Sequence, residues 1–153
     1  MSENALTEKI IGAAIEVHRH LGPGLLESAY EECLCYELAL AGLSFQRQVR
    51  LPVRYKGLSL DCGYKMDLVV QDAIVVELKA IDGLLPVHSA QLLTYLRSAG
   101  KQVGLLINFN VEILKAGIKR VVNHYSGPEI SSASSSVPPR LRDELEPAPQ
   151  ETL

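Results

Sequence analysis

Cysteine is scarce in this sequence, and the few cysteines present do not indicate a disulfide framework. The 153 residues include three cysteines, Cys33, Cys35 and Cys62. Three thiols cannot all pair within one chain, so we expect buried thiols in a reducing compartment. The spacing of Cys33 and Cys35 also differs from that of a common zinc knuckle, which argues against a cysteine-ligated metal.

Long apolar runs are also absent. No stretch of eighteen apolar residues occurs, although apolar residues make up 47% of the chain. We therefore expect a globular protein without a membrane span. The first residues, Met-Ser-Glu-Asn, lack the basic and apolar parts of a signal peptide, so we expect a cytoplasmic location and no membrane partner.

An excess of positive charge is likewise missing. The chain has 15 Lys and Arg residues against 18 Asp and Glu residues. Residues 127–153 contribute two basic and five acidic residues, which leaves thirteen of each sign in residues 1–126. A neutral body does not indicate strong non-specific binding to DNA, although a local basic patch could still bind it.

The length and the C-terminal composition predict one folded domain followed by a tail. A chain of 153 residues can bury one core and is short for two domains. From Ser126 the composition changes to Ser, Pro, Gly and Glu, which cannot bury enough apolar area to offset the entropy of ordering. We therefore expect a single domain at residues 1–125 and a disordered tail at 126–153.

The body of the chain alternates helical and extended patterns. Thr7 is a candidate N-cap for the first helix, and Gly42 is suited to follow the end of the second. Residues 103–109 are almost wholly apolar, which is typical of a strand buried on both faces. This order of elements predicts an α/β sandwich around a mixed sheet. The expected helices span about 7–20, 26–41 and 89–99, and the expected strands lie within about 45–55, 58–62, 64–81, 103–109 and 118–122.

A β-hairpin is predicted between Tyr64 and Ile81. Two apolar, β-branched runs are separated there by the short polar loop Gln71–Ala73. With this loop, Val70 faces Ile74 across the ladder. Alternate residues then share one face that must belong to the core: Leu68, Val70, Ile74, Val76 and Leu78.

Three charged residues share the other face of this hairpin. The same register places Asp67 opposite Glu77, and alternation puts Lys79 on the face that they share. Opposed carboxylates repel each other, and a divalent cation beside a lysine would offset the repulsion. A cross-strand ion pair between Asp67 and Lys79 is the structural alternative. Such an exposed pair contributes only about 0–1 kcal/mol and does not account for Glu77.

Three segments together resemble a known family. Asp67, followed one strand later by Glu77–Lys79, resembles the active-site signature of the PD-(D/E)XK nuclease superfamily. Gly24–Tyr30 fits the motif of the GxxExxY protein family within that superfamily. Gln91–Tyr95 fits the Gln-x-x-x-Tyr element of its RecB-like branch. The resemblance covers residues 5–125 and implies a restriction-endonuclease-like α-β-β-β-α-β sandwich with a central mixed sheet.

The resemblance also implies a metal site and its chemistry. Asp67, Glu77 and the backbone carbonyl of Leu78 would bind Mg²⁺ or Mn²⁺, and Glu27 would be a further ligand to the metal or its water. Lys79 would lower the pKa of the attacking water or hold it in line, and it would steady the charge of the transition state.

A helix following the hairpin carries further polar candidates. Gln91 and Tyr95 are four residues apart on one face, with His88 three residues before Gln91. They could hold a substrate phosphate or orient Lys79. The structural alternative is an ordinary polar helix face.

Other candidate residues also have structural interpretations. Glu27 could simply favour the macrodipole in the first turn of its helix, and Tyr30 suits core packing better than catalysis. His18 lies on the apolar stripe of the first helix, which favours a packed, hydrogen-bonded histidine. A histidine on that helix assists metal binding in some RecB-like relatives.

The leading hypothesis is a divalent-metal-dependent nuclease that hydrolyses phosphodiester bonds in DNA. The alternative is a catalytically weak or inactive module of nuclease fold that binds nucleic acid or a protein partner. A third interpretation is hydrolysis of another phosphate ester by the same residues. The small size of the domain also makes a homodimer a reasonable expectation.

Overall fold

A five-stranded mixed sheet forms the middle layer of the structure, a computed structural model that describes residues 1–124. The sheet order is β1-β4-β5-β6-β7, with β5 and β6 parallel and the other neighbours antiparallel. The tail expected at 126–153 lies outside the described residues. The helices are α1 (Glu3–Leu21), α2 (Glu27–Leu40) and α3 (Pro86–Ala99), and the strands are β1 (Phe45–Arg50), β2 (Val53–Tyr55), β3 (Leu58–Leu60), β4 (Lys65–Val70), β5 (Ile74–Lys79), β6 (Val103–Asn108) and β7 (Ile118–Val122), with a short 3-10 helix η1 (Leu114–Gly117) before β7.

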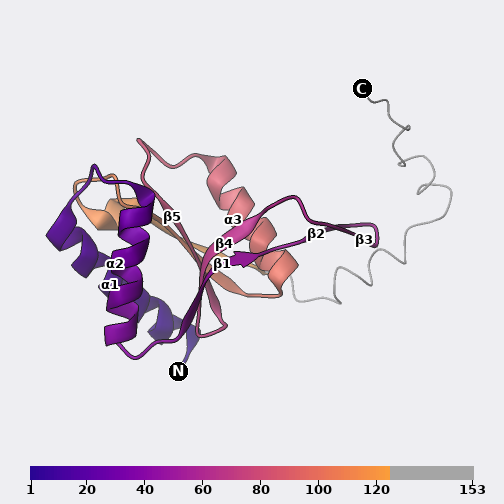
Figure 1. The fold of residues 1–153 in the computed structure, drawn as a ribbon, viewed down its shortest axis with the longest axis horizontal. Coiled ribbons are helices and arrows are strands. Elements are labelled where there is room, and N and C mark those ends of the chain that lie inside the picture. The colour runs from indigo at the N-terminus through magenta and orange to yellow at the C-terminus, as the bar shows by residue number, and fades with distance from the viewer. Residues whose placement is uncertain (125–153) are drawn as a thin grey trace.

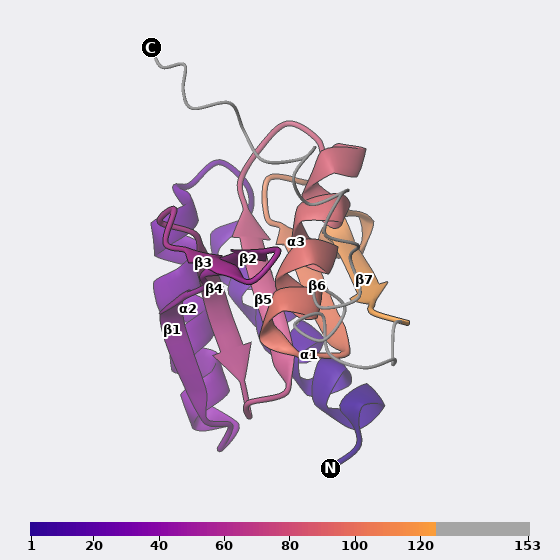
Figure 2. The same ribbon diagram turned by 90° about the vertical axis from the view of Figure 1, so that its right-hand side faces the viewer.

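Helices cover both faces of the sheet (Figures 1 and 2). Helices α1 and α2 pack on one face and α3 packs on the other, where it connects the parallel strands β5 and β6. This arrangement confirms the expected α/β sandwich with a mixed central sheet. Among residues 1–124, no helix is long and apolar enough to cross a membrane.

Side-chain alternation divides the core into two clusters. The predicted core face of the hairpin, with Leu68 and Leu78 fully buried, packs under α1 and α2. The opposite face contributes Val69 and Val75, which pack against Leu92 and other residues of α3. Strand β6 is buried along its entire length, as its apolar sequence predicts.

Helix α1 begins earlier than predicted. Ser2, not Thr7, is the N-cap, and its hydroxyl accepts a hydrogen bond from the Ala5 N–H at 3.1 Å. Thr7 lies inside the helix, where its hydroxyl donates to the Asn4 carbonyl. The expectation was wrong because the buried stripe of the helix already begins at Leu6, one residue before Thr7.

The single strand expected over residues 45–55 was also wrong. Strand β1 ends at Arg50, and β2 pairs with β3 in a separate two-stranded ribbon. Pro52 separates the two strands and has no N–H to donate to a ladder. The Leu51 N–H donates instead to the Tyr64 carbonyl at 2.9 Å, across the base of the ribbon. Only β1 therefore joins the central sheet.

Candidate active site

The β4–β5 hairpin brings Asp67 and Glu77 together. Its ladder has the predicted register, with Val70 opposite Ile74 and Leu68 opposite Val76. Beyond Leu68, side chains replace the backbone ladder. The Asp67 N–H donates to Glu77 Oε2 at 2.9 Å, and the Leu78 N–H donates to Asp67 Oδ2 at 2.8 Å. Each carboxylate is therefore fixed by a backbone donor of the other strand.

The electrostatic environment of these two carboxylates is unfavourable for their charged forms. Glu77 is only 7% exposed. Its burial, and next the Asp67 carboxylate, raise the pKa of Glu77 to about 8. Burial also raises the pKa of Asp67. A positive ion at this position would relieve both effects.

Lys79 is the cation whose charge acts on both Asp67 and Glu77. Its side chain is half-buried and, within the described residues, forms no direct ion pair. Its charge nevertheless lowers the pKa values of Asp67, Glu77 and Glu27 against the larger effect of burial. Lys79 therefore acts on all three carboxylates without neutralising any one of them by contact.

Glu27 joins the site from α2, where it is the first helical residue. Burial, and next the Asp67 charge, raise the pKa of Glu27. Glu27 is thus a third carboxylate that interacts electrostatically with Asp67, and its role as a ligand stays a prediction.

The other members of that motif fix the loop that precedes Glu27. The Tyr30 hydroxyl donates to the Gly22 carbonyl at 2.5 Å and accepts from the Leu25 N–H at 3.1 Å. The Tyr30 ring is fully buried and stacks on Phe109 with centroids 4.4 Å apart. Tyr30 is thus the packing residue that was expected, and it also holds the start of α2.

Gly24 completes this loop. Its φ of +100° favours glycine, and its N–H donates to Asn110 Oδ1 at 3.1 Å. Asn108, which is 1% exposed, forms two 3.0 Å hydrogen bonds with the backbone of Ile81. These asparagines connect the loop before Glu27 to the chain just after Lys79. Sequence analysis missed them, although a polar residue inside the apolar run 103–109 was an available signal.

Glu31 and Gln48 were also missed. Glu31 is 7% exposed, and its carboxylate accepts from Arg47 Nε and from Gln48 Nε2, each at 3.0 Å. The same Gln48 amide lies 3.4 Å from Asp67 Oδ1. Gln48 has a φ of +49°, which an L-residue adopts at a cost. This strained residue connects the buried carboxylate of α2 to the hairpin pair, and no sequence pattern predicts it.

Helix α3 contributes Tyr95 and, one turn earlier, Gln91. Tyr95 is buried, and its burial, followed by the charge of Glu77, raises the pKa of its hydroxyl to about 12. Tyr95 therefore lies near the carboxylates and stays protonated. Gln91 is half-buried on the same helix face. His88 has a structural role, because its Nδ1 accepts from the Leu85 N–H at the start of α3.

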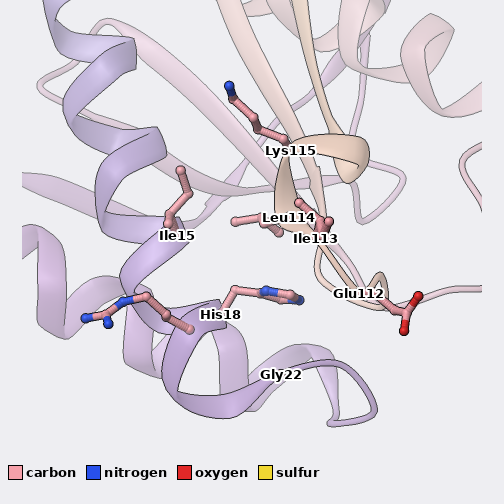
Figure 3. A pocket seen from close by; sticks show the side chains of 8 residues that line it. Ile15, His18, Gly22, Glu112, Ile113, Leu114 and Lys115 are labelled. Atoms are coloured by element: carbon pink, nitrogen blue, oxygen red, sulfur yellow. The ribbon is translucent and has the colours of Figure 1, made fainter.

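A cavity lies away from these carboxylates. A pocket of about 440 Å³ separates the end of α1 from residues 112–115, and Figure 3 shows His18 pointing from α1 toward Glu112 and Ile113. None of the candidate carboxylates lines it. His18 is buried and its Nε2 lies 2.7 Å from the Val111 carbonyl. The packed, hydrogen-bonded histidine expected from the sequence is confirmed.

The donor set suits a hard divalent cation. Within residues 1–124, no three histidine, cysteine, aspartate or glutamate side chains are grouped closely enough to hold a metal by themselves. Asp67 and Glu77 still offer two carboxylates, and the Leu78 carbonyl lies on the strand edge that faces Asp67, because its own N–H points there. Magnesium is commonly bound by one or two carboxylates with several waters, so these residues fit such an ion.

Comparison with known proteins gives one family. The family model of the PD-(D/E)XK nuclease superfamily matches residues 4–121. No match was found among curated proteins or among solved structures. The matched segment contains both hairpin carboxylates, the lysine that follows them, helices α2 and α3, and all of α1 after Glu3.

Proposed function

The chain belongs to the PD-(D/E)XK nuclease superfamily, and on that premise we propose that it is a divalent-metal-dependent nuclease that hydrolyses DNA. Membership supports a nuclease-type function in general and a restriction-endonuclease-like fold. The observation that carries the proposal is the buried carboxylate of Glu77 next to the half-buried carboxylate of Asp67, both with pKa values raised beside Lys79. We also propose membership of the GxxExxY family, because Gly24 and Tyr30 hold the loop before Glu27. We propose the RecB-like branch because Gln91 and Tyr95 lie one turn apart on α3.

Members of this superfamily generally use divalent metals. Asp67 and Glu77 would hold Mg²⁺ or Mn²⁺ here, with the Leu78 carbonyl on the same edge and Glu27 reaching the ion directly or through a water. When bound, such an ion neutralises charge at the phosphate and helps to generate a nucleophile from water. The protein residues then have the tasks of orienting water and substrate.

Lys79 is the candidate for orienting the attacking water. Its ammonium influences three carboxylates without pairing with any of them, so its N–H donors stay available for a water or a phosphate oxygen. Tyr95 keeps its proton well above neutral pH and can donate to a phosphate. Gln91, one turn earlier, can contribute a second neutral donor on the same side.

A binding module without catalysis is the second candidate function. It is favoured by one observation, since no third side chain completes a metal-binding group within residues 1–124. Isothermal titration with Mg²⁺ and Mn²⁺ separates the two. Binding that Asp67→Asn abolishes supports the nuclease, whereas no heat at millimolar metal supports the module.

Cleavage of labelled single- and double-stranded DNA tests the proposal directly. We expect Mn²⁺-dependent cleavage that falls about 100-fold or more in Lys79→Ala and in Glu77→Ala, because each removes an interaction with the developing charge or its metal. Lys119→Ala and Glu8→Ala change exposed residues on β7 and α1 and serve as matched controls. Cleavage that persists in both site variants would identify a contaminant and contradict the proposal.

A further inference from the structure

The neutral charge of residues 1–126 hides a strong internal asymmetry. Residues 45–66 contain five basic residues and one acidic residue, whereas the rest of this body contains eight basic and twelve acidic residues. The basic segment comprises β1, the β2–β3 ribbon and the start of β4. Positive potential is therefore concentrated on one part of the fold.

The ribbon stands out from the sheet as a separate element. We call residues 51–64 the arm. Its strands pair only with each other, and it extends on the same side of the sheet as α3 (Figures 1 and 2). Its base is anchored by Leu51, which is 5% exposed and packs in the cluster beneath α3. Its outer part is open to solvent, with Leu58 58% exposed.

Three cations of this segment have no carboxylate partner among the described residues. Arg47 is paired with Glu31 and Glu32, and Arg50 is paired with Asp61. The three that remain are Arg54, Lys56 and Lys65.

The surroundings of two of these cations are unfavourable for the free protein. Lys65 lies directly opposite Arg50 in the β1–β4 register, a like-charge pair that destabilises a sheet. The Lys56 ammonium is buried without a hydrogen-bond partner, 5.5 Å from the centre of the Tyr55 ring. A phosphate beside Lys65 would offset its repulsion from Arg50, and Lys56 would gain a partner by swinging its ammonium out toward the same phosphate chain.

Aromatic side chains accompany these cations. Tyr55 is 47% exposed on β2, and Tyr64 is 43% exposed at the end of the arm. The Tyr64 ring meets Tyr95 edge-on with centroids 6.1 Å apart, and Tyr95 is coupled electrostatically to Glu77. The arm is therefore continuous with the face of the sheet that carries the candidate active site.

We propose that the arm is a nucleic-acid-binding element that guides a strand toward the carboxylates. Arg54 of the arm and Lys65, the first residue of β4 beside it, contact backbone phosphates, and Lys56 does so once its ammonium swings out from the Tyr55 ring. Tyr55 offers a ring on which an unpaired base stacks. The inference rests on the proposed function and deepens it by assigning substrate binding to residues outside the catalytic group. It also explains how a protein without net positive charge holds a polyanion.

Fluorescence anisotropy with labelled oligonucleotides tests the arm. The measurements use full-length Glu77→Gln protein with EDTA, so that the probe stays intact, and compare single-stranded and double-stranded probes over a salt series. The arm variant combines Arg54→Gln, Lys56→Gln and Lys65→Gln. The control combines Lys9→Gln, Lys115→Gln and Lys119→Gln, which removes the same charge from exposed residues outside the arm. Thermal melts verify that both triple variants remain folded.

We expect the arm variant to lose affinity about tenfold or more at low salt, while the control changes little. Loss of three phosphate contacts should also lower the slope of log affinity against log salt by about 2 for a single strand. Tyr55→Ala should weaken single-stranded binding more than double-stranded binding, because only unpaired bases can stack on the ring.

The outcomes separate the arm from the nuclease proposal. If the arm and control variants bind DNA with equal affinity, the proposed binding role of the arm is overturned, even if the wild-type protein cleaves DNA. Arm-dependent binding without any metal-dependent cleavage supports the arm and contradicts the nuclease. The arm variant could instead bind DNA as the control does, while light scattering shows a dimer that Leu58→Ser dissociates. This result would assign the arm to self-association and overturn the inference.

Discussion

At the scale of single residues, Asp67 and Glu77 illustrate how a protein maintains two carboxylates in a position that disfavours their charge. Each accepts a hydrogen bond from a backbone N–H of the neighbouring strand, which stabilises the charged form, while burial and mutual repulsion oppose it. The balance raises the pKa of Glu77 to about 8. Keeping these two carboxylates charged destabilises the metal-free protein, and a bound cation would offset that cost.

A pH-dependent stability follows for the metal-free protein. The pKa of Glu77 rises from its usual 4.5 to about 8 on folding, so the folded state binds more protons between these values and loses stability as pH rises through them. Glu77→Gln removes this titration and should show a smaller decline from pH 5 to pH 8. Urea unfolding in EDTA measures it, with Glu8→Gln as the exposed control. An identical decline in Glu77→Gln and wild type would show that Glu77 titrates normally.

Gln48 offers a test of backbone strain. Its φ of +49° favours glycine, so Gln48→Gly and Gln48→Ala lose the same hydrogen bond to Glu31, but only the alanine variant retains the strained backbone. We expect Gln48→Gly to be more stable than Gln48→Ala by about 1 kcal/mol in urea unfolding. Equal stabilities of the two variants would show that the left-handed conformation costs nothing here.

At the scale of elements, the loop between α1 and α2 determines where Glu27 lies. The Tyr30 hydroxyl bonds to both sides of this loop, and Asn110 holds Gly24 from the segment after β6. The motif that contains Glu27 therefore consists of one candidate ligand and two residues that position it.

Tyr30→Phe tests this positioning role. The variant retains the ring that stacks on Phe109 but leaves the Gly22 carbonyl and the Leu25 N–H without their partner. We expect a loss of about 1–3 kcal/mol in unfolding free energy and a weaker affinity for Mn²⁺ in calorimetry, since Glu27 is held less firmly. Tyr36→Phe, on the exposed face of α2, is the matched control. A destabilised Tyr30→Phe protein with unchanged metal affinity would limit Tyr30 to packing.

Some elements could be predicted from the sequence because their signals are local. The β4–β5 hairpin follows from two β-branched runs and a polar loop, which fixed the register and both faces. The break after β1 depends on Pro52 together with a distant contact from Leu51 to Tyr64, and the position of Gln48 depends on the buried Glu31. Such long-range contacts leave no periodic pattern in the sequence.

At the scale of the whole molecule, average charge is a poor guide to how this protein could bind nucleic acid. The body is neutral, yet basic residues cluster in one segment of 22 residues and carboxylates gather around the hairpin and α2. If the arm binds phosphate as we propose and the carboxylates hold a cation, the two lie side by side in an arrangement suited to phosphodiester hydrolysis. Neither half of that arrangement is visible in the net charge.

The central claim is that Asp67 and Glu77 exist to hold a divalent cation, and a crystal of the protein soaked in Mn²⁺ tests it most directly. The account predicts an anomalous difference peak in contact with both carboxylates and near the Leu78 carbonyl, and its loss in Asp67→Asn. No peak at millimolar Mn²⁺, or a peak confined to another part of the molecule such as the His18 pocket, would contradict it.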